Sequence, residues 1–299
     1  MRGTHEHFVL RSIRFFMAMQ HPSFSRQPGP VGIFDSGYGG LTVFDKIRQR
    51  LPEYDYIYLG DNARAPYGPR SFEVVYQFTR QAVMRLFQEG CQLVILACNT
   101  ASAKALRTIQ QNDLPRWDAS RRVLGVIRPT TEIVDSVSKT KHVGVLGTVG
   151  TISSGSYVLE IEKMFPHIRV TGEACPMWVP LVETGEFDSP GADYFVQKNL
   201  DHILSVDPLI DTLILGCTHY PLLLEKIRRF TPARVTLLPQ GEYVADSLAD
   251  YLHRHTEMDA RLTKGHTRRF LTTESAEKFS EAASLFLSAP ICVEKIDLA

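Results

Sequence analysis

The sequence predicts an α/β protein with two similar lobes, and three patterns lead to that prediction. Apolar, strand-like runs alternate with helical stretches from residue 31 onward, which is typical of parallel sheets flanked by helices. The run at 31–34 has a counterpart at 143–146, and the run at 93–97 has a counterpart at 213–216, in the same order. A chain of 299 residues is long enough for two such units. We therefore expect a duplicated α/β unit with ligand bound in the cleft between the lobes.

The elements of the first copy are bounded by glycine and proline. A Gly-rich turn at 35–40 separates the first strand from the first helix, Pro52 stops that helix, and Gly90 closes a long helix that Ser71 caps. The predicted strands are 31–34, 54–59, 93–97 and 123–127, and the predicted helices are 41–50, 71–89, 101–111 and 131–138.

The second copy starts at His142 and repeats this order. Its predicted strands are 142–146, 168–171 and 212–215, a turn covers 147–151, and its predicted helices are 153–165, 192–206 and 222–230. The last 50 residues show no motif of their own.

Composition excludes several classes of protein. The chain carries 33 basic and 33 acidic residues, so no charge excess points to nucleic acid or to a membrane surface, and no apolar stretch is long enough to span a bilayer. Its five cysteines are odd in number and form no Cys-x-x-Cys pair, which argues against a disulfide framework and against a zinc site. We expect a cytoplasmic protein that binds no metal.

Residues 1–29 differ from the rest, being rich in arginine and poor in acidic residues. A transit peptide would have this composition. The favoured interpretation is a disordered extension or an upstream start codon, with Met17 and Met19 as later starts.

Two cysteines end matching strands and are followed at once by small polar residues. The segments are Cys98-Asn99-Thr100 and Cys217-Thr218-His219. Ligands of α/β proteins bind where parallel strands end. Two such ends facing one another would place a thiol on either side of a small molecule, an arrangement suited to removing a proton from one face of a carbon and returning it to the other.

Each cysteine has a second interpretation, because buried free cysteines often serve as small hydrophobes. Cys98 precedes a predicted helix N-terminus, a position that lowers a thiol pKa. Cys217 lies two residues before His219, which can accept or hold the thiol proton. Function is therefore favoured for both, whereas Cys91, Cys175 and Cys292 lack such neighbours and are interpreted as structural.

Other polar residues lie in turns where an anion could bind. Asp35 and Ser36 either cap the following helix or, with the turn glycines, approach a ligand. Thr148 and Thr151 sit at the equivalent turn of the second copy, and Asp61 is a turn or capping residue.

Four motifs together resemble the glutamate racemase family. They lie in the family's order between about residues 31 and 245, and they read VGIFDSGYGGL at 31–41, GD at 60–61 with APYG at 65–68, ACNTAS at 97–102 and GCTHYP at 216–221.

That resemblance implies a cofactor-independent enzyme that supplies D-glutamate for peptidoglycan. It implies that Cys98 deprotonates D-glutamate with help from Asp35, and that Cys217 deprotonates L-glutamate with help from His219, near Glu183. The implied substrate contacts are Asp35, Ser36, Tyr67, Gly68, Asn99, Thr100, Thr148, Thr151, Thr218 and His219. The resemblance further implies a first lobe of 30–125 plus 240–299, a second lobe of 126–239, and a homodimer.

Three alternatives remain at this point. The first is an aspartate racemase or a related two-cysteine isomerase or lyase. The second is a thiol redox enzyme, which needs a resolving thiol within disulfide reach. The third is a two-lobed protein that binds its ligand without catalysis.

Overall fold

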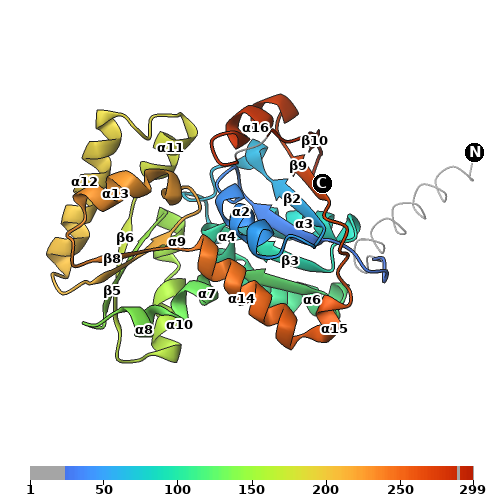
Figure 1. Cartoon of the computed structure of the whole chain (residues 1–299), viewed down its shortest axis with the longest axis horizontal. Helices are drawn as coiled ribbons and strands as arrows, with labels where there is room; N and C mark the ends of the chain where they lie inside the picture. Colours follow the sequence, from blue (N-terminus) through green and yellow to red (C-terminus); the bar gives the residue numbers. More distant parts are fainter. Residues whose placement is uncertain (1–23, 288–289, 299) are drawn as a thin grey trace, which may run out of the picture.

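Two lobes, each built on one parallel sheet, form the computed structural model, which describes residues 24–287 and 290–298 (Figure 1). The predicted fold class is therefore confirmed. The extension expected over residues 1–29 lies outside the described residues as far as residue 23. Residues 24–29 are packed on the first lobe, where Phe24 stacks against Phe87 and Gly29 bridges to Leu262, so the expectation of disorder is wrong for this short stretch.

The first sheet has six parallel strands in the order β10-β9-β2-β1-β3-β4. The strands are β1 (Val31–Asp35), β2 (Tyr56–Gly60), β3 (Leu93–Leu96), β4 (Arg122–Gly125), β9 (Arg268–Thr272) and β10 (Val293–Lys295). The central strands β1, β2 and β3 are buried along their whole length, as expected for a parallel sheet covered on both faces.

Successive side chains of β1 enter different cores. Ile33 packs in a core with helices α2 and α14, and Phe34 packs in a core with α3 and α4 on the opposite face. The helices of this lobe are α2 (Leu41–Arg50), α3 (Phe72–Gln88), α4 (Asn99–Lys104), α5 (Leu106–Thr108), α6 (Leu114–Trp117), α14 (Gly241–Arg254), α15 (Thr256–Asp259) and α16 (Ala276–Ala283), with a 3₁₀ turn η1 (Asn62–Arg64) and a π turn η2 (Ile109–Asp113).

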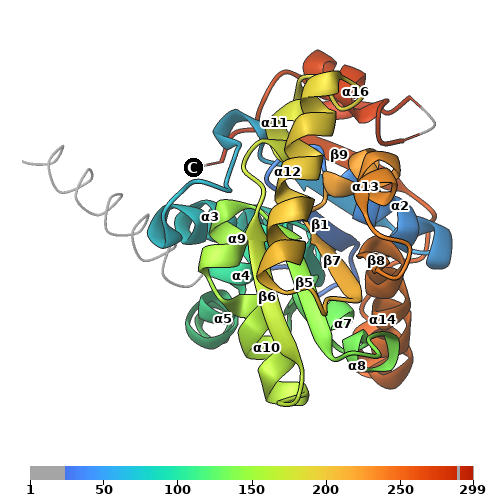
Figure 2. The same ribbon diagram turned by 90° about the vertical axis from the view of Figure 1, so that its left-hand side faces the viewer.

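The second sheet has four parallel strands in the order β6-β5-β7-β8. The strands are β5 (His142–Gly147), β6 (Arg169–Ala174), β7 (Thr212–Gly216) and β8 (Thr236–Pro239). Its helices are α7 (Ile127–Thr131), α8 (Val134–Val137), α9 (Val149–Ser153), α10 (Ser156–Met164), α11 (Trp178–Glu183), α12 (Pro190–Val206) and α13 (Leu224–Phe230), with a 3₁₀ turn η3 (Tyr220–Leu223). Figure 2 faces this lobe, and α12 lies across one side of its sheet.

The two sheets repeat one strand order. Numbering the strands within each copy, both follow the order second, first, third, fourth, as β2-β1-β3-β4 and as β6-β5-β7-β8. Cys98 and Cys217 each lie just beyond the third strand of their copy. The duplication inferred from the sequence therefore places the two thiols at equivalent sheet positions.

Several element boundaries differ from those predicted. The helix expected from residue 153 starts at Val149 and breaks at Gly155, whose φ of 66° is left-handed. The strand expected over 168–171 continues to Ala174, and the helix expected over 131–138 is two short helices that begin earlier, at Ile127. After residue 239 the chain returns to the first lobe, where β9 pairs with β2 and α14 packs against α2.

Candidate active site

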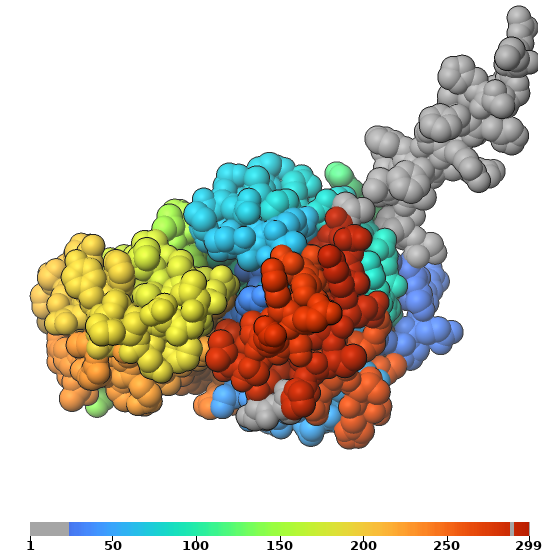
Figure 3. All heavy atoms as spheres, turned by 90° about the horizontal axis from the view of Figure 1, so that it is seen from above, coloured from blue at the N-terminus to red at the C-terminus, as the bar shows by residue number. Residues whose placement is uncertain are grey.

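A cavity of about 170 Å³ lies between the lobes and takes its lining from both. Figure 3 shows the C-terminal residues of the first lobe, in red, beside the yellow segments of the second lobe. The predicted site residues that line the cavity are Ser36, Tyr67, Gly68, Cys98, Asn99, Thr100, Thr148, Glu183, Cys217, Thr218 and His219. A cavity of this size, with two thiols and several hydroxyl groups in its wall, fits a small polar molecule.

Cys98 is the N-cap of α4, and its sulfur contacts two hydrogen-bonding groups. The Ala101 backbone N–H donates to Cys98 Sγ over 3.4 Å, and Ser36 Oγ lies 3.4 Å from the same sulfur. The helix N-terminus acts to lower the pKa of this thiol, as expected, but the net pKa is raised and not lowered. Burial, together with the neighbouring charge of Asp35, raises the pKa of Cys98 to about 12 and outweighs both hydrogen bonds.

Cys217 has a different neighbour. Its Sγ lies 3.8 Å from His219 Nδ1, and His219 Nε2 lies 3.1 Å from Glu183 Oε1, forming a thiol–imidazole–carboxylate series. Burial acts to lower the pKa of His219, but the hydrogen bonds to Cys217 and Glu183 prevail and raise it to about 10. The imidazole is therefore protonated at neutral pH, and its positive charge lies beside the Cys217 sulfur.

Asp35 lies behind the cavity wall, although it was predicted to contact substrate. Its side chain is fully buried, accepts from the Gly37 N–H over 2.9 Å, and accepts from Thr218 Oγ1 over 3.4 Å. Burial raises the pKa of Asp35, whereas the nearby charge of His219 lowers it. Asp35 thus links the two lobes and acts on Cys98 through its charge, while the direct contact with that sulfur comes from Ser36.

Three threonine hydroxyls from the two lobes meet at one end of the cavity. Thr100 Oγ1 lies 2.9 Å from Thr148 Oγ1 and 3.3 Å from Thr151 Oγ1, and the last two are 3.1 Å apart. Thr148 also caps α9 by accepting from the Thr151 N–H over 3.2 Å. Thr100 and Thr148 face the cavity, whereas Thr151 lies behind them.

The loop that carries Tyr67 and Gly68 is held by a buried carboxylate. Asp61 accepts hydrogen bonds from the Tyr67 hydroxyl, from Arg64 Nε over 2.7 Å and from Thr273 Oγ1 over 2.9 Å. Asp61 is more than the turn residue expected from the sequence, because it ties the loop to the end of β9.

Sequence reasoning missed a third thiol at this site. Cys175 lines the cavity directly after β6 and close to Cys217, and burial raises its pKa well above the usual range. It was interpreted as a structural cysteine because it lacks polar neighbours in the chain like those of Cys98 and Cys217. With the strand continued to Ala174, Cys175 is a third thiol at a strand end, although Pro176 and Met177 follow it instead of small polar residues.

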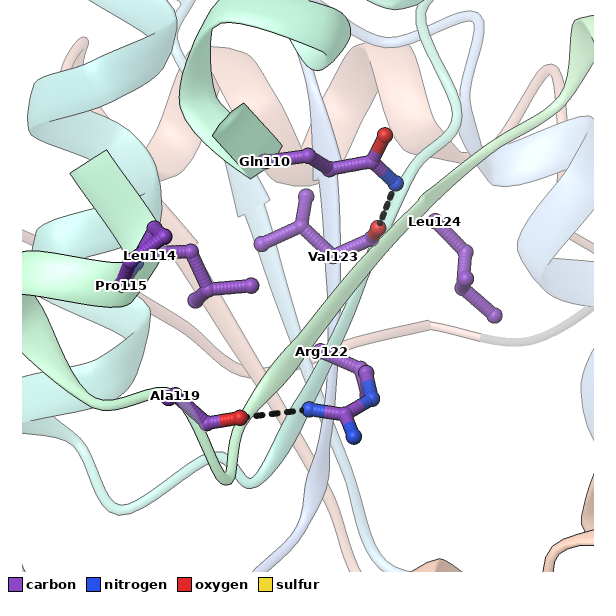
Figure 4. Close-up of a pocket in the computed structure, with 7 residues that line it drawn as sticks. All are labelled: Gln110, Leu114, Pro115, Ala119, Arg122, Val123 and Leu124. Atoms are coloured by element: carbon purple, nitrogen blue, oxygen red, sulfur yellow. Dashed lines mark hydrogen bonds between the residues drawn. The ribbon is translucent and has the colours of Figure 1, made fainter. Parts of the chain in front are cut away.

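A second hollow lies at the edge strand β4 and is lined by Gln110, Leu114, Pro115, Ala119, Arg122, Val123 and Leu124 (Figure 4). Its polar side chains already bond to backbone, Gln110 Nε2 donating to Val123 O and Arg122 Nη1 to Ala119 O, each over 2.7 Å. Although this hollow is larger, at about 310 Å³, its lining contains no thiol, carboxylate or imidazole. We therefore place the chemistry in the cavity between the lobes.

Two features are absent from the part of the chain that the structure describes. Within residues 24–287 and 290–298, no three His, Cys, Asp or Glu side chains are grouped as a metal site would require. Over the same part of the chain, every helix is too short or too polar to cross a bilayer.

Comparison with known proteins assigns the chain to a family. Residues 38–238 match the family model described as Asp/Glu/Hydantoin racemase. The chain is 41% identical to the glutamate racemase of Shouchella clausii, over 87% of this chain and 90% of that protein, and 39% identical to that of Ruegeria sp., over 88% and 98%.

Two solved structures are similar to this fold. A glutamate racemase isoform from Bacillus anthracis matches with a TM-score of 0.82 and 36% identity, covering 90% of this chain and 98% of that one. The Francisella tularensis glutamate racemase, solved in complex with D-glutamate, matches with a TM-score of 0.80 and 32% identity, covering 91% and 98%.

Proposed function

The chain belongs to the Asp/Glu/hydantoin racemase family, and on that basis we propose that it interconverts L-glutamate and D-glutamate by a two-thiol mechanism. One observation supports the mechanism above all others. Cys98 and Cys217 come from equivalent strand ends of the two lobes, line the same cavity, and have neighbours of opposite charge. The curated relatives at about 40% identity are glutamate racemases, which supports glutamate over aspartate as the substrate.

The different surroundings of the two thiols prepare them for opposite roles. Protonated His219 places a positive charge beside the Cys217 sulfur, which we propose as the base, whereas burial and the Asp35 charge raise the pKa of Cys98 and keep it a neutral thiol. Because the enantiomers are equal in energy, a racemase needs one base and one acid in each direction. This arrangement suits a substrate whose α-proton faces Cys217, which by the family resemblance is L-glutamate.

Two proton transfers, one at each thiol, convert L-glutamate to D-glutamate. The Cys217 thiolate takes the α-proton from one face of L-glutamate, leaving a carbanion, and the Cys98 thiol donates its own proton to the opposite face. D-glutamate leaves, with Cys217 as thiol and Cys98 as thiolate. Loss of the Cys217 proton to solvent and gain of a solvent proton by Cys98 restore the starting state. Hydroxyl donors at Ser36, Thr100 and Thr148 line the cavity and would stabilise the charged carboxylate of the substrate as the carbanion forms.

The decisive test follows the α-hydrogen in D₂O. Purified protein is incubated with L-glutamate, D-glutamate or L-aspartate, and both α-deuterium and the opposite enantiomer are measured. We expect deuterated opposite enantiomer from either form of glutamate, and neither product from the Cys98→Ala or Cys217→Ala variant, with circular dichroism confirming that both variants fold.

Each alternative predicts a different result. A preference for aspartate would identify an aspartate racemase, and binding of glutamate without exchange at the α-carbon would identify a binding protein. A thiol redox enzyme would lose activity when oxidant is removed, whereas the proposed racemase keeps its activity. The proposed chemistry requires both thiols to be reduced, which agrees with the predicted cytoplasmic location. Supply of D-glutamate for peptidoglycan and a homodimer stay predictions from the family.

A further inference from the structure

Three buried polar side chains at the junction of the lobes form a closed ring of hydrogen bonds. Asn99 Nδ2 donates to Gln240 Oε1 over 2.6 Å, Gln240 Nε2 donates to the Tyr157 hydroxyl over 2.6 Å, and Tyr157 donates to Asn99 Oδ1 over 2.7 Å. Their exposed fractions are only 2%, 4% and 3%, respectively. Burying three polar groups is costly unless each is satisfied, and here the ring satisfies them all.

Contacts outside the ring fix its direction. Gln240 Nε2 also faces the Val126 carbonyl oxygen at 3.3 Å and Thr130 Oγ1 at 3.1 Å. A carbonyl oxygen accepts only, so the amide nitrogen of Gln240 must point toward it. That orientation makes Gln240 Oε1 the acceptor for Asn99, and each member then donates to the next.

The ring lies next to both reactive thiols. Asn99 directly follows Cys98, at the start of α4 in the first lobe. Tyr157, from α10 of the second lobe, packs on Gly216, the residue directly before Cys217: a Cβ added to Gly216 would lie 3.4 Å from the Tyr157 hydroxyl oxygen. Gln240 lies where the chain leaves β8 of the second sheet and enters α14 on the first lobe.

We propose that Tyr157 and Gln240 are positioning residues, and that their ring with Asn99 sets the separation of the two thiols. The inference rests on the proposed two-thiol racemization and extends it, since the α-carbon must be within reach of both sulfurs at once. Neither Tyr157 nor Gln240 lines the cavity, so their effect on the reaction passes through the backbone beside Cys98 and Cys217. The ring also occupies Asn99 Oδ1 and one hydrogen of its amide, leaving the Asn99 backbone N–H and the second amide hydrogen for a substrate.

The first test is Tyr157→Phe, which removes one hydroxyl and keeps the aromatic ring. We expect kcat to fall between about tenfold and about a hundredfold, because a misplacement near 1 Å can cost about a hundredfold in rate. We expect KM to change much less. The matched control is Tyr56→Phe, because Tyr56 is equally buried and donates to the Leu51 carbonyl in the first lobe, away from the cavity. Its kcat should stay at the wild-type value.

The second readout separates positioning from loss of folded enzyme. In D₂O with L-glutamate, wild-type protein should place deuterium mainly in D-glutamate. When the two thiols are misplaced relative to each other, Cys98 donates to the carbanion less often. Cys217, after exchanging its proton for deuterium from the solvent, then returns deuterium to the original face and gives labelled L-glutamate. We expect the ratio of deuterium in recovered L-glutamate to that in D-glutamate to rise in Tyr157→Phe. A smaller folded fraction would lower both labels equally.

Gln240→Leu provides an independent variant, with Gln92→Leu as its control. Gln92 is also a buried glutamine with a bonded amide, donating to the carbonyls of Gln27 and Gly90 far from the thiols. We expect Gln240→Leu to raise the deuterium ratio and Gln92→Leu to leave it unchanged. The inference is overturned if wild-type protein racemizes glutamate while Tyr157→Phe and Gln240→Leu keep either the wild-type kcat or the wild-type deuterium ratio. If the wild-type protein does not racemize glutamate at all, the proposed function itself has failed.

Discussion

Replacement of Gly39 by alanine tests whether the fit between the lobes controls catalysis. Gly39 lies in the turn before α2 of the first lobe and faces the segment of the second lobe that follows Cys217. A Cβ at this position would lie 2.5 Å from His219 Nδ1 and 2.5 Å from Thr218 Oγ1, whereas ordinary contact begins at 3.4 Å. The difference between 3.4 and 2.5 Å means that these atoms must move by about 0.9 Å.

His219 has little freedom to absorb that movement. Its Nε2 is held by Glu183 at 3.1 Å, and the side chain of Phe286 packs edge to face against its ring, with centroids 6.1 Å apart. The displacement must therefore lengthen the 3.8 Å contact between His219 Nδ1 and Cys217 Sγ, or separate the lobes. Since misplacement by 1 Å can cost about a hundredfold in rate, we expect kcat of Gly39→Ala to fall by about that factor.

The assay is the initial rate of racemization followed by circular dichroism, with a thermal melt to show that the variant folds. The control is Gly37→Ala in the same turn, where the added Cβ would meet its nearest atom, Glu183 Oε1, at 3.4 Å. We expect this control to remain close to the wild-type rate. A folded Gly39→Ala variant with at least half of the wild-type kcat would refute the reasoning, because the clash would then have been absorbed without disturbing the site.

Three further predictions concern charge and stability. Glu183→Gln removes a charge that raises the pKa of His219, so the imidazolium should be lost at a lower pH. The alkaline limb of the pH profile of kcat/KM should therefore move down from near pH 10, and an unmoved limb would contradict this. His219→Asn should lower kcat more from L-glutamate than from D-glutamate, while kcat/KM stays equal in the two directions because the enantiomers have equal energy; equal losses of kcat would count against the assignment of sides. Arg121→Ala removes a fully buried guanidinium that donates to the Phe87 carbonyl over 3.0 Å. This change should lower the free energy of unfolding, measured by urea titration, by about 3 kcal/mol. Replacing the exposed Arg122 by alanine should change it by less than about 1 kcal/mol.

Local patterns predicted the elements whose ends are marked by special residues. The helix expected over 41–50 occurs as α2 (Leu41–Arg50), because glycines precede it and Pro52 follows it. Ser71 caps α3 as expected, accepting from the Val74 N–H over 3.3 Å. Boundaries without such markers were displaced, as at the start of α7, whose N-cap Val126 makes no side-chain hydrogen bond.

The C-terminal strands could not be placed in this way. β9 is only five residues long, and β10 is only three. The position of β9 depends on pairing with β2, which is more than 200 residues earlier in the chain, and β10 in turn pairs with β9. Local spacing carries no information about a partner so far away. The resemblance to a family, and not any pattern in the residues, led to the expectation that this segment completes the first lobe.

The sequence by itself determined the α/β class, the duplication and the two thiols at strand ends, because these depend on short periodic runs and on the residues that end them. Tertiary structure alone decided what surrounds each thiol: Ser36 against Cys98, Cys175 in the same cavity as Cys217, and Asp35 buried behind the wall. It also decided the direction of the Cys98 pKa and the ring that joins Tyr157 to Gln240. Burial and contacts between residues far apart in the chain produce these properties, and both exist only once the two lobes are packed together.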